Sequence, residues 1–287
     1  MEITMQFDVE ETIRRRKSVR SYDGRPLAAD DRDAIEALIE ALLAEESPFP
    51  AKMHIRLLEA KPGTDTEHLG TYGVIRGATA FLGVTAENTP TAPEAVGYTF
   101  EKLVLAAAAA GLGTCWMAGT FDRAQFAGLL GVGEDEIFPI ISPIGYPVEK
   151  KALIDSVFRK VGKSDSRKPW AELFSDGSFG VPLDEARAGA YAFPLEMLRL
   201  APSAANRQPW RVVRADGGFH FFRQANPKTK YAFDLQRLDT GIAACHFELA
   251  ARDRGLTGGF VRLDASDCEA ASAAPADMTY LFSWTEA

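Results

Sequence analysis

The sequence predicts a mixed helix-and-strand protein that is built from two related halves. Helix and strand patterns alternate through the first half of the chain, and the same order of patterns returns after residue 183. When the chain is shifted against itself by 144 positions, Gly97 meets Gly241 and the pair Gly111-Leu112 meets Gly255-Leu256. An alanine-rich helix produces part of such a match by chance, so the repeated order of elements is what favours an internal duplication.

A stretch without any sustained period sets the boundaries of the two halves. Residues 149–182 are charged and carry Gly, Ser and Pro without a helix or strand pattern, which is typical of a connecting segment. We therefore expect a first half over residues 1–148, a linker or crossover arm over 149–182, and a second, shorter half over 183–287.

The first half combines helix patterns with apolar strand patterns. Apolar residues recur at helical spacing in 30–44. The strongest helix pattern stops at Gly111, where glycine favours a left-handed cap, and Asp122 is typical of the N-cap of a short helix ending at Gly131. The other predicted elements are a short helix ending near Arg16, helices over 30–44 and 98–110, and strands over 54–58, 80–85 and 137–145.

The second half repeats this order around a clear hairpin signal. Asp216-Gly217 separates two apolar runs, which is typical of a tight β-turn between antiparallel strands. Gly255 ends a long helix pattern in the same way as Gly111 does in the first half. The predicted elements are helices over 184–200 and 238–254, and strands over 211–215, 219–223, 258–263 and 278–284.

Composition and charge exclude several classes of protein. The 287 residues are 46% hydrophobic and 25% charged, as in an ordinary soluble globular protein. The longest apolar stretch, 103–112, is far shorter than the about 20 residues of a membrane span, and the N-terminus lacks the apolar segment of a signal peptide. The net charge of −8 argues against nucleic-acid binding. We expect a cytoplasmic protein without a membrane or nucleic-acid partner.

Cysteine and histidine positions predict neither a disulfide framework nor a metal site. The three cysteines are an odd number at unrelated spacings, and the histidines lack ligand spacing to cysteines or carboxylates. No G-x-G-x-x-G follows a strand pattern, so no dedicated dinucleotide domain is expected. The residues concerned are Cys115, Cys245, Cys268, His54, His68, His220 and His246.

Three short stretches carry residue types that bind ligands. They are Arg16-Lys17-Ser18-Val19-Arg20, Gly111-Leu112-Gly113-Thr114-Cys115-Trp116 and Ala201-Pro202-Ser203-Ala204-Ala205-Asn206-Arg207-Gln208-Pro209-Trp210. Each has a structural alternative. The basic stretch can be a solvated helix end, the middle stretch can lead into a buried strand, and Pro202-Ser203 can simply end a helix. The last alternative leaves the Asn-x-Gln-Pro-Trp pattern unexplained.

Together these stretches resemble the flavin-binding segments of the nitroreductase family, and most closely those of its tandem, single-chain members. The resemblance covers residues 11–260. It implies an α+β nitroreductase-like sandwich whose two halves form a pseudo-dimer within a monomeric chain. It also implies an oxidoreductase with one noncovalently bound FMN per chain and NAD(P)H as a transient co-substrate. Its acceptor would be a nitroaromatic, quinone or similar electron-poor molecule, reduced by a ping-pong mechanism.

The resemblance assigns a phosphate-binding role to the basic stretch. Arg16, Lys17 and Ser18 occupy the family's phosphate positions, where arginine supplies a planar fork of donors and serine a short neutral one. A second basic pair completes the clamp in the family, and Arg167, with Lys168 as the alternative, holds that place.

The resemblance also assigns residues to the flavin ring, while the flavin itself carries the chemistry and no side chain is expected to be catalytic. Arg20 takes the place of a cation at the pyrimidine end, where it stabilises the negative charge of the reduced ring. A backbone amide in the segment after Cys115 would donate to the ring nitrogen that accepts hydride. The implied contacts are Trp116, Met117, Ala118 and Gly119 from the first half, and Pro202, Ser203, Ala204 and Asn206 from the second.

Each half has kept only one part of this set. Where the second half should repeat R-x-S-x-R, around 179–183, there is no basic cluster, and where the first half should repeat the APSxxN loop it has Glu46-Ser47-Pro48-Phe49-Pro50. One composite FMN site per chain follows from this distribution. The alternative is a non-catalytic flavin-binding or scaffold protein that has kept the nitroreductase fold, because a fold alone does not establish activity.

Overall fold

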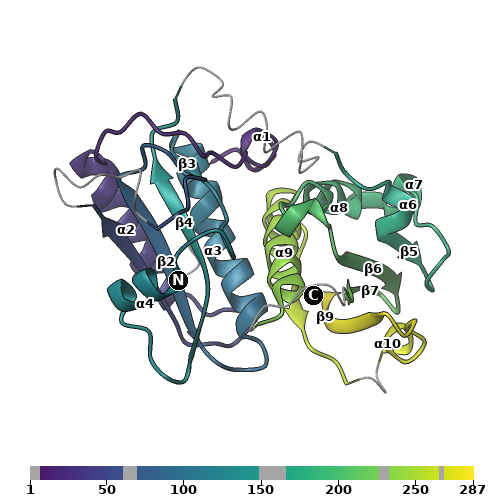
Figure 1. Cartoon of the computed structure of the whole chain (residues 1–287). Coiled ribbons are helices and arrows are strands. Elements are labelled where there is room, and N and C mark those ends of the chain that lie inside the picture. Colours follow the sequence, from purple (N-terminus) through teal and green to yellow (C-terminus); the bar gives the residue numbers. More distant parts are fainter. Residues whose placement is uncertain (1–6, 61–69, 149–165, 226–232, 265–267) are drawn as a thin grey trace. The chain divides into compact units, whose positions relative to one another are not determined.

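The computed structural model describes residues 7–60, 70–148, 166–225, 233–264 and 268–287. The chain divides into two compact units, and each is described by itself. The first unit comprises Met1–Ala92 and Thr99–Ser164, and the second comprises Pro93–Tyr98 and Asp165–Ala287. Figure 1 labels their elements along a colour scale that runs from purple at the N-terminus to yellow at the C-terminus.

The first unit holds a four-stranded antiparallel sheet in the order β1-β2-β4-β3. Both predicted ends of the helix between Asp122 and Gly131 are observed. The Asp122 carboxylate accepts from the backbone N–H of Gln125, and Gly131 ends the helix in the left-handed region. The elements are α1 (Val9–Arg15), α2 (Ala29–Ala44), β1 (Met53–Glu59), β2 (Ala80–Glu87), α3 (Ala92–Ala109), β3 (Gly113–Thr114), α4 (Arg123–Leu130) and β4 (Glu136–Gly145).

The second unit holds a five-stranded sheet in the order β5-β6-β7-β9-β8, in which only the β5–β6 pair is parallel. Its helices are α6 (Trp170–Leu173), α7 (Glu185–Ala188), α8 (Ala192–Arg199), α9 (Leu235–Asp253) and α10 (Glu269–Ser272), with 3₁₀ turns η2 (Gly189–Tyr191) and η3 (Ala204–Asn206). Its strands are β5 (Phe174–Asp176), β6 (Trp210–Ala215), β7 (Gly218–Gln224), β8 (Gly258–Val261) and β9 (Met278–Glu286).

The two sheets share one topology once β5 is set aside. The order β6-β7-β9-β8 repeats β1-β2-β4-β3, with α9 following β7 as α3 follows β2. The helix ends match in detail under the 144-residue shift: Leu112 N donates to Ala107 O at 2.9 Å, and Leu256 N donates to Ala251 O at 2.9 Å. Gly111 and Gly255 both adopt positive φ, +82° and +70°. The two units therefore share one strand order and one form of helix end, and the internal duplication that the sequence predicts stays a prediction.

Three elements differ from the sequence prediction. Helix α3 begins at Ala92, six residues before the predicted start at 98, because Pro93 falls in its first turn, where a missing N–H costs nothing. The predicted helix over 184–200 is interrupted at Gly189, whose φ of +59° only glycine adopts easily. The described part of the expected arm, 166–182, contains α6 and β5 and belongs to the second unit.

Each unit has its own apolar core. In the first unit α4 packs on the sheet, with Phe81 and Phe126 in edge-to-face contact at 5.4 Å between ring centroids. In the second unit Phe247 of α9 contacts Phe221 at 5.5 Å and Trp284 at 5.5 Å, so the helix covers one face of the sheet. Among the described helices, none is both long and apolar enough to cross a bilayer.

A close helix crossing inside the second unit depends on two equivalent glycines. A Cβ on Gly97 would lie 2.1 Å from the Leu238 carbonyl oxygen, and a Cβ on Gly241 would lie 2.3 Å from the Glu94 carbonyl oxygen. The 144-residue shift maps Gly97 onto Gly241 and Glu94 onto Leu238, so the two contacts are reciprocal. Neither position has room for a methyl group.

We predict that Gly241→Ala lowers the free energy of unfolding by about 1–3 kcal/mol, because the added methyl forces two backbones apart. Each kcal/mol corresponds to a shift of about 2–4 °C in the thermal midpoint, measurable by circular dichroism. The matched control is Gly128→Ala in α4, where a Cβ meets nothing within 4 Å. That change should leave the midpoint unchanged or raise it. Equal midpoints for both variants would contradict the close-packing argument.

Candidate functional site

The structure brings two of the three motif stretches together within the first unit. Ser18 forms a parallel bridge with Thr114 of β3, and the Val19 N–H donates to the Thr114 carbonyl at 2.8 Å. A Cβ on Gly113 would lie 2.8 Å from the Val19 side chain, so glycine is required for this close approach. The basic stretch therefore runs directly beside the strand that leads to Trp116.

The basic side chains of this stretch differ in their surroundings. Arg15 donates to the carbonyls of Ala108 and Ala109 at 2.9 and 3.3 Å, and so caps the end of α3. Lys17 is exposed, while Arg16 and Ser18 are half-buried. Among the residues that the structure describes, the buried Nε of Arg16 has no hydrogen-bond partner. Arg15 thus has a structural role, and Arg16 keeps donor capacity for a ligand.

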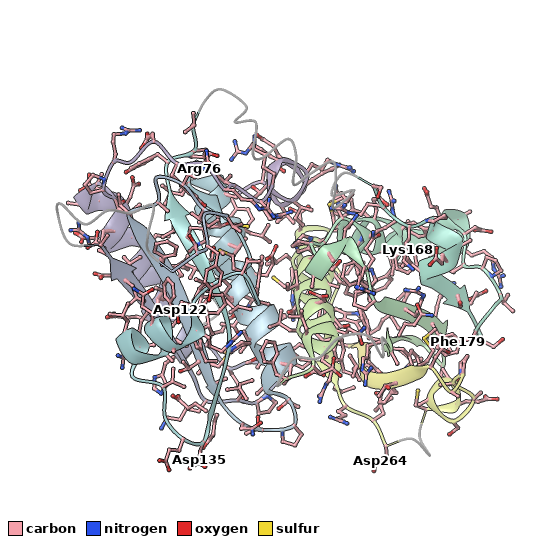
Figure 2. The ribbon with its side chains drawn as sticks, in the orientation of Figure 1. Arg76, Asp122, Asp135, Lys168, Phe179 and Asp264 are labelled. Carbon is pink, nitrogen blue, oxygen red and sulfur yellow. The ribbon has the colours of Figure 1, made fainter. Side chains whose placement is uncertain are left out.

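Arg76 is a cation beside this stretch that the sequence analysis did not single out. Its N–H donates to the Arg20 carbonyl at 2.9 Å, and its carbonyl accepts from the Tyr22 N–H at 2.8 Å. Gly77 allows this pairing, because a Cβ there would lie 2.2 Å from the Tyr22 carbonyl oxygen. Figure 2 labels Arg76, whose side chain is exposed. In the sequence, the feature that could have marked Arg76 was its place between Gly73 and Gly77, since glycines permit close backbone approach.

The segment after β3 is buried and paired like a strand at one residue and open to a ligand at others. Met117 pairs with Ile141 through two 3.0 Å backbone hydrogen bonds, and its side chain is 2% exposed. Its amide and side chain are thus used within the unit. Trp116 and Ala118 are half-buried and Gly119 is exposed. The Trp116 indole N–H donates to the Glu101 carboxylate at 2.7 Å.

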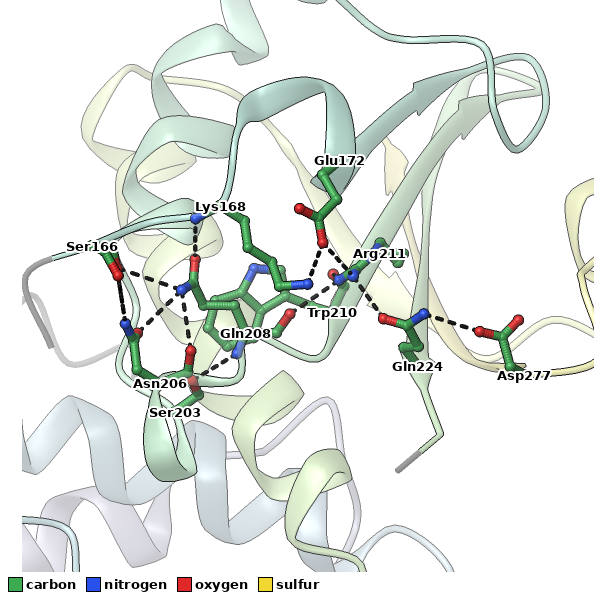
Figure 3. Close-up of polar contacts among 10 residues, drawn as sticks. All are labelled: Ser166, Lys168, Glu172, Ser203, Asn206, Gln208, Trp210, Arg211, Gln224 and Asp277. Carbon is green, nitrogen blue, oxygen red and sulfur yellow. Dashed lines mark hydrogen bonds and ion pairs between the residues drawn. The ribbon is translucent and has the colours of Figure 1, made fainter. Parts of the chain in front are cut away.

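The third motif stretch forms a hydrogen-bonded loop in the second unit (Figure 3). The Ser203 hydroxyl oxygen accepts from the Gln208 N–H at 2.9 Å, and the Gln208 side-chain amide donates to the Asn206 Oδ1 at 3.1 Å. Gln208 is 2% exposed. Gln208, the Gln of Asn-x-Gln-Pro-Trp, is therefore the centre of the loop's hydrogen-bond network. The sequence pattern included this residue but did not predict its contacts.

Residues 166–168 are attached to the same loop. The Asn206 amide donates to the Ser166 carbonyl at 3.0 Å, and the Lys168 N–H donates to the Gln208 Oε1 at 2.8 Å. Arg167 donates to the Leu200 carbonyl at 2.9 Å. The Lys168 ammonium forms an ion pair with Glu172. The structure thus places Arg167 and Lys168 beside the Pro202–Asn206 stretch, although these residues are distant in sequence.

The loop holds an unusual backbone. Ala205, Asn206 and Gln208 have φ values of +51°, +53° and +49°, in the left-handed region that favours glycine. Non-glycine residues in this region cluster at ligand sites, where surrounding contacts hold them in place. The local sequence alone does not favour this conformation, so the side-chain bonds to Ser203, Asn206 and Gln208 maintain it.

A buried carboxyl group lies under the loop. Both oxygens of Asp239, in α9, accept from the Ala204 N–H at 3.1 and 3.2 Å, and the residue is 3% exposed. Burial raises the pKa of the Asp239 carboxyl well above its ordinary value, and the Ala204 hydrogen bond offsets this only in part. Asp239 was not predicted from the sequence, where its only signal was an acidic residue on an otherwise apolar helix face.

The predicted site residues therefore form two clusters, each inside one unit. The first comprises Arg16, Lys17, Ser18, Arg20, Trp116, Met117, Ala118 and Gly119, and the second comprises Arg167, Lys168, Pro202, Ser203, Ala204 and Asn206. Within the described part of the chain, no group of three or more His, Cys, Asp or Glu side chains could hold a metal ion.

Comparison with known proteins identifies the class to which this architecture belongs. A family model described as "Putative TM nitroreductase" matches residues 8–251. A solved structure titled a putative nitroreductase, from Thermotoga maritima, is 19% identical with a TM-score of 0.60, and the match covers 100% of this chain and 97% of that chain. No curated protein matches the sequence.

Shorter nitroreductases also match about half of the chain. A nitroreductase with bound FMN from Bacteroides fragilis is 24% identical with a TM-score of 0.40, covering 52% of this chain and 92% of that chain. A putative nitroreductase in complex with FMN from Desulfovibrio desulfuricans is 22% identical with a TM-score of 0.42, covering 58% of this chain and 95% of that chain.

The two sheets and their helices define a protein of the nitroreductase fold, a fold of oxidoreductases. The chain belongs to the TM nitroreductase family, since the family model matches most of its length. The resemblance in the three motif stretches is thereby confirmed at the level of family and fold.

We predict that Gln208→Ala lowers the free energy of unfolding by about 2–3 kcal/mol, because the Lys168 N–H and the Asn206 Oδ1 lose a buried partner. Urea unfolding followed by fluorescence measures the change. Arg207→Ala is the matched control, since Arg207 is exposed in the same loop and its removal should change the free energy by no more than about 0.5 kcal/mol. A Gln208 variant as stable as the control would show that the network does not hold the loop.

Proposed function

We propose that this protein is an FMN-dependent oxidoreductase that passes hydride from NAD(P)H to an electron-poor acceptor such as a nitroaromatic or a quinone. Membership of the nitroreductase family supports the reaction class. The observation that carries the proposal is the pairing of the Arg16–Arg20 stretch with β3, which places phosphate-binding residue types beside Trp116.

The residues of the first cluster fit the phosphate of FMN. The buried Arg16 Nε has no partner among the described residues, and a guanidinium matches phosphate oxygens with parallel donors. Lys17 adds an exposed charge, and Ser18 adds a hydroxyl donor next to it. In our proposal Arg167 or Lys168 completes this clamp. The Lys168 ammonium pairs with Glu172 and the Arg167 guanidinium donates to the Leu200 carbonyl, so the two residues stay alternatives.

A second group of residues would contact the flavin ring. Arg20 supplies a cation for the pyrimidine end, and Arg76, whose backbone pairs with that of Arg20, is a further candidate. Because the Met117 amide already bonds to Ile141, the amide donor to the ring is expected from Ala118 or Gly119. The loop from Pro202 to Asn206 presents small side chains suited to close approach of a flat ring.

One FMN site per chain is the stoichiometry that we propose. The R-x-S-x-R stretch occurs only in the first half and the APSxxN loop only in the second, so a full set of residues is available once. The left-handed loop at Ala205 and Asn206 supports this, because the corresponding 46–50 segment contains no described residue with positive φ. A monomer would then suffice for activity.

FMN bound at these residues would supply the hydride-transfer chemistry between NAD(P)H and the acceptor. The protein would contribute binding and electrostatics: Arg16 and Ser18 would hold the phosphate, and Arg20 would stabilise negative charge at the pyrimidine end of the ring. An amide donor at Ala118 or Gly119 would stabilise charge without side-chain reorganisation. Both substrates would use one pocket in turn, which gives ping-pong kinetics with parallel double-reciprocal lines.

The purified protein tests this proposal directly. We expect flavin absorbance, one FMN released by heat per chain, and bleaching on anaerobic addition of NADH or NADPH. Flavin without bleaching by either nicotinamide would support the alternative of a non-catalytic flavin-binding protein. A ratio near two, or FAD in place of FMN, would contradict the single composite site.

We predict that Arg16→Ala weakens FMN binding by about 10- to 100-fold, the loss of one charge-assisted phosphate bond. Stability without FMN should barely change, because the Arg16 Nε has no described partner to lose. Fluorescence titration of the apoprotein with FMN measures the dissociation constant.

Arg14→Ala is the matched control for this change. Arg14 lies on the same helix end and is half exposed, and its guanidinium pairs with Glu10 at 3.0 Å. Its removal should leave FMN affinity unchanged. If both variants bind FMN like the wild type, the basic stretch is a solvated helix end.

We predict that Asn206→Asp impairs FMN binding and, where binding survives, lowers the flavin midpoint potential. The change replaces a donor to the Ser166 carbonyl with a negative charge, and this charge opposes a ring that becomes anionic on reduction. Spectroelectrochemical titration measures the potential. Asn206→Ala separates the two effects, since it removes the donor without adding charge. Identical potentials in the wild type and both variants would place Asn206 away from the flavin.

A further inference from the structure

We propose that Asp239 is a positioning residue that fixes the Pro202–Asn206 loop through the backbone N–H of Ala204. This inference rests on the proposed function, because it names a residue that prepares the same loop for FMN. Asp239 itself lies in α9 and would act only through the loop.

The contact geometry supports this role. Both carboxyl oxygens of Asp239 lie within 3.2 Å of the Ala204 nitrogen, and the residue is 3% exposed. Ala204 directly precedes Ala205 and Asn206, the first two residues with left-handed φ. A buried backbone N–H without an acceptor is costly. The carboxyl group therefore satisfies the donor at the point where the strained backbone begins.

Asp239 fixes a part of the loop that its other bonds do not reach. Ser203, Asn206 and Gln208 bond to one another and to Ser166 on the far side of the loop. The Ala204 N–H links the loop to α9 through the Asp239 side chain. Asp239 thus anchors the loop to the helix, while the Ser166 contacts anchor it to residues 166–168.

The internal repeat provides a comparison within the chain. The 144-residue shift maps Asp239 of α9 onto Ala95 of α3, which is also fully buried. The half that carries the APSxxN loop has the carboxyl group, and the half that carries Glu46-Ser47-Pro48-Phe49-Pro50 in its place has alanine. The glycines of the helix crossing, Gly97 and Gly241, are the same in both halves. The carboxyl group accompanies the loop and is not a requirement of the helix.

The first test measures the loop without any flavin. In the full-length apoprotein, Asp239→Ala should increase hydrogen exchange at the Ala204 amide at least about tenfold, because its acceptor is gone. Asp239→Asn keeps an oxygen acceptor and should retain the wild-type exchange rate within about threefold. Asp239→Leu, which fills the volume without an acceptor, should behave like the alanine variant and excludes an effect of the cavity alone.

The second test measures the flavin site. Asp239→Ala should weaken FMN binding about tenfold and shift the flavin midpoint potential, whereas Asp239→Asn should preserve both. Cys245→Ala is the control: it removes a buried side chain from the same helix and should lower stability while leaving affinity and potential unchanged. Combined with Ser203→Ala, the effect of Asp239→Ala on affinity should be less than additive, because both act through one loop.

The outcomes separate this inference from the proposed function. Wild-type exchange at Ala204 in both the alanine and leucine variants would overturn the positioning role, whatever the protein binds. Faster exchange in Asp239→Ala together with unchanged FMN affinity and midpoint potential would also overturn the inference, because the loop would then be loosened without any effect on the flavin site. A wild-type protein that binds no FMN contradicts the proposed function, and the exchange experiment still decides whether Asp239 fixes the loop.

Discussion

The loop between α8 and β6 has a left-handed backbone that its residues do not favour, so it depends on side-chain hydrogen bonds to keep its shape. Three of its non-glycine residues occupy the left-handed region, at a cost of about 1–2 kcal/mol each. The total of about 3–6 kcal/mol is a large fraction of the free energy of folding of a small domain. The hydrogen bonds that Gln208 donates and Asp239 accepts offset this cost, and both side chains are almost fully buried. The loop thus has a fixed shape before any ligand arrives, so less ordering entropy is lost on binding.

In the first unit, the cluster of predicted site residues is positioned by backbone pairing. Backbone pairing, rather than side-chain bonding, places the basic stretch beside β3, and glycine at 113 permits the close approach. Because the backbone fixes the position, the Arg16 side chain is not required for the fold and retains an unsatisfied donor. The Arg15 side chain next to it is used to cap α3. Neighbouring residues of one charged run therefore differ: the Arg15 side chain has a structural role, and that of Arg16 is available for the phosphate-binding role that we propose.

The sequence predicted those features that depend on local chemistry. Asp122 as N-cap and Gly111, Gly131 and Gly255 as helix ends were confirmed, since each acts within one turn of its own position. The strand β5 was missed because it depends on pairing with the distant strand β6. The early start of α3 was missed although Pro93 in its first turn was a local signal. The contacts of Gln208 and Asp239 in the loop were not predicted, because burial and partner identity arise only from tertiary structure. How the FMN-binding residues are used remains a prediction.

The equivalent strands β1 and β6 are protected from unwanted pairing by different means. In the second unit β5 pairs along β6 in parallel and covers the backbone edge of that strand. In the first unit β1 pairs only with β2 among the described strands, and its exposed side chains include His54, Arg56 and Glu59. Charged side chains on an edge discourage a second chain from adding to the sheet. Replacing them with apolar residues would turn β1 into a template for aggregation, whereas the same change on β6 would leave its edge covered.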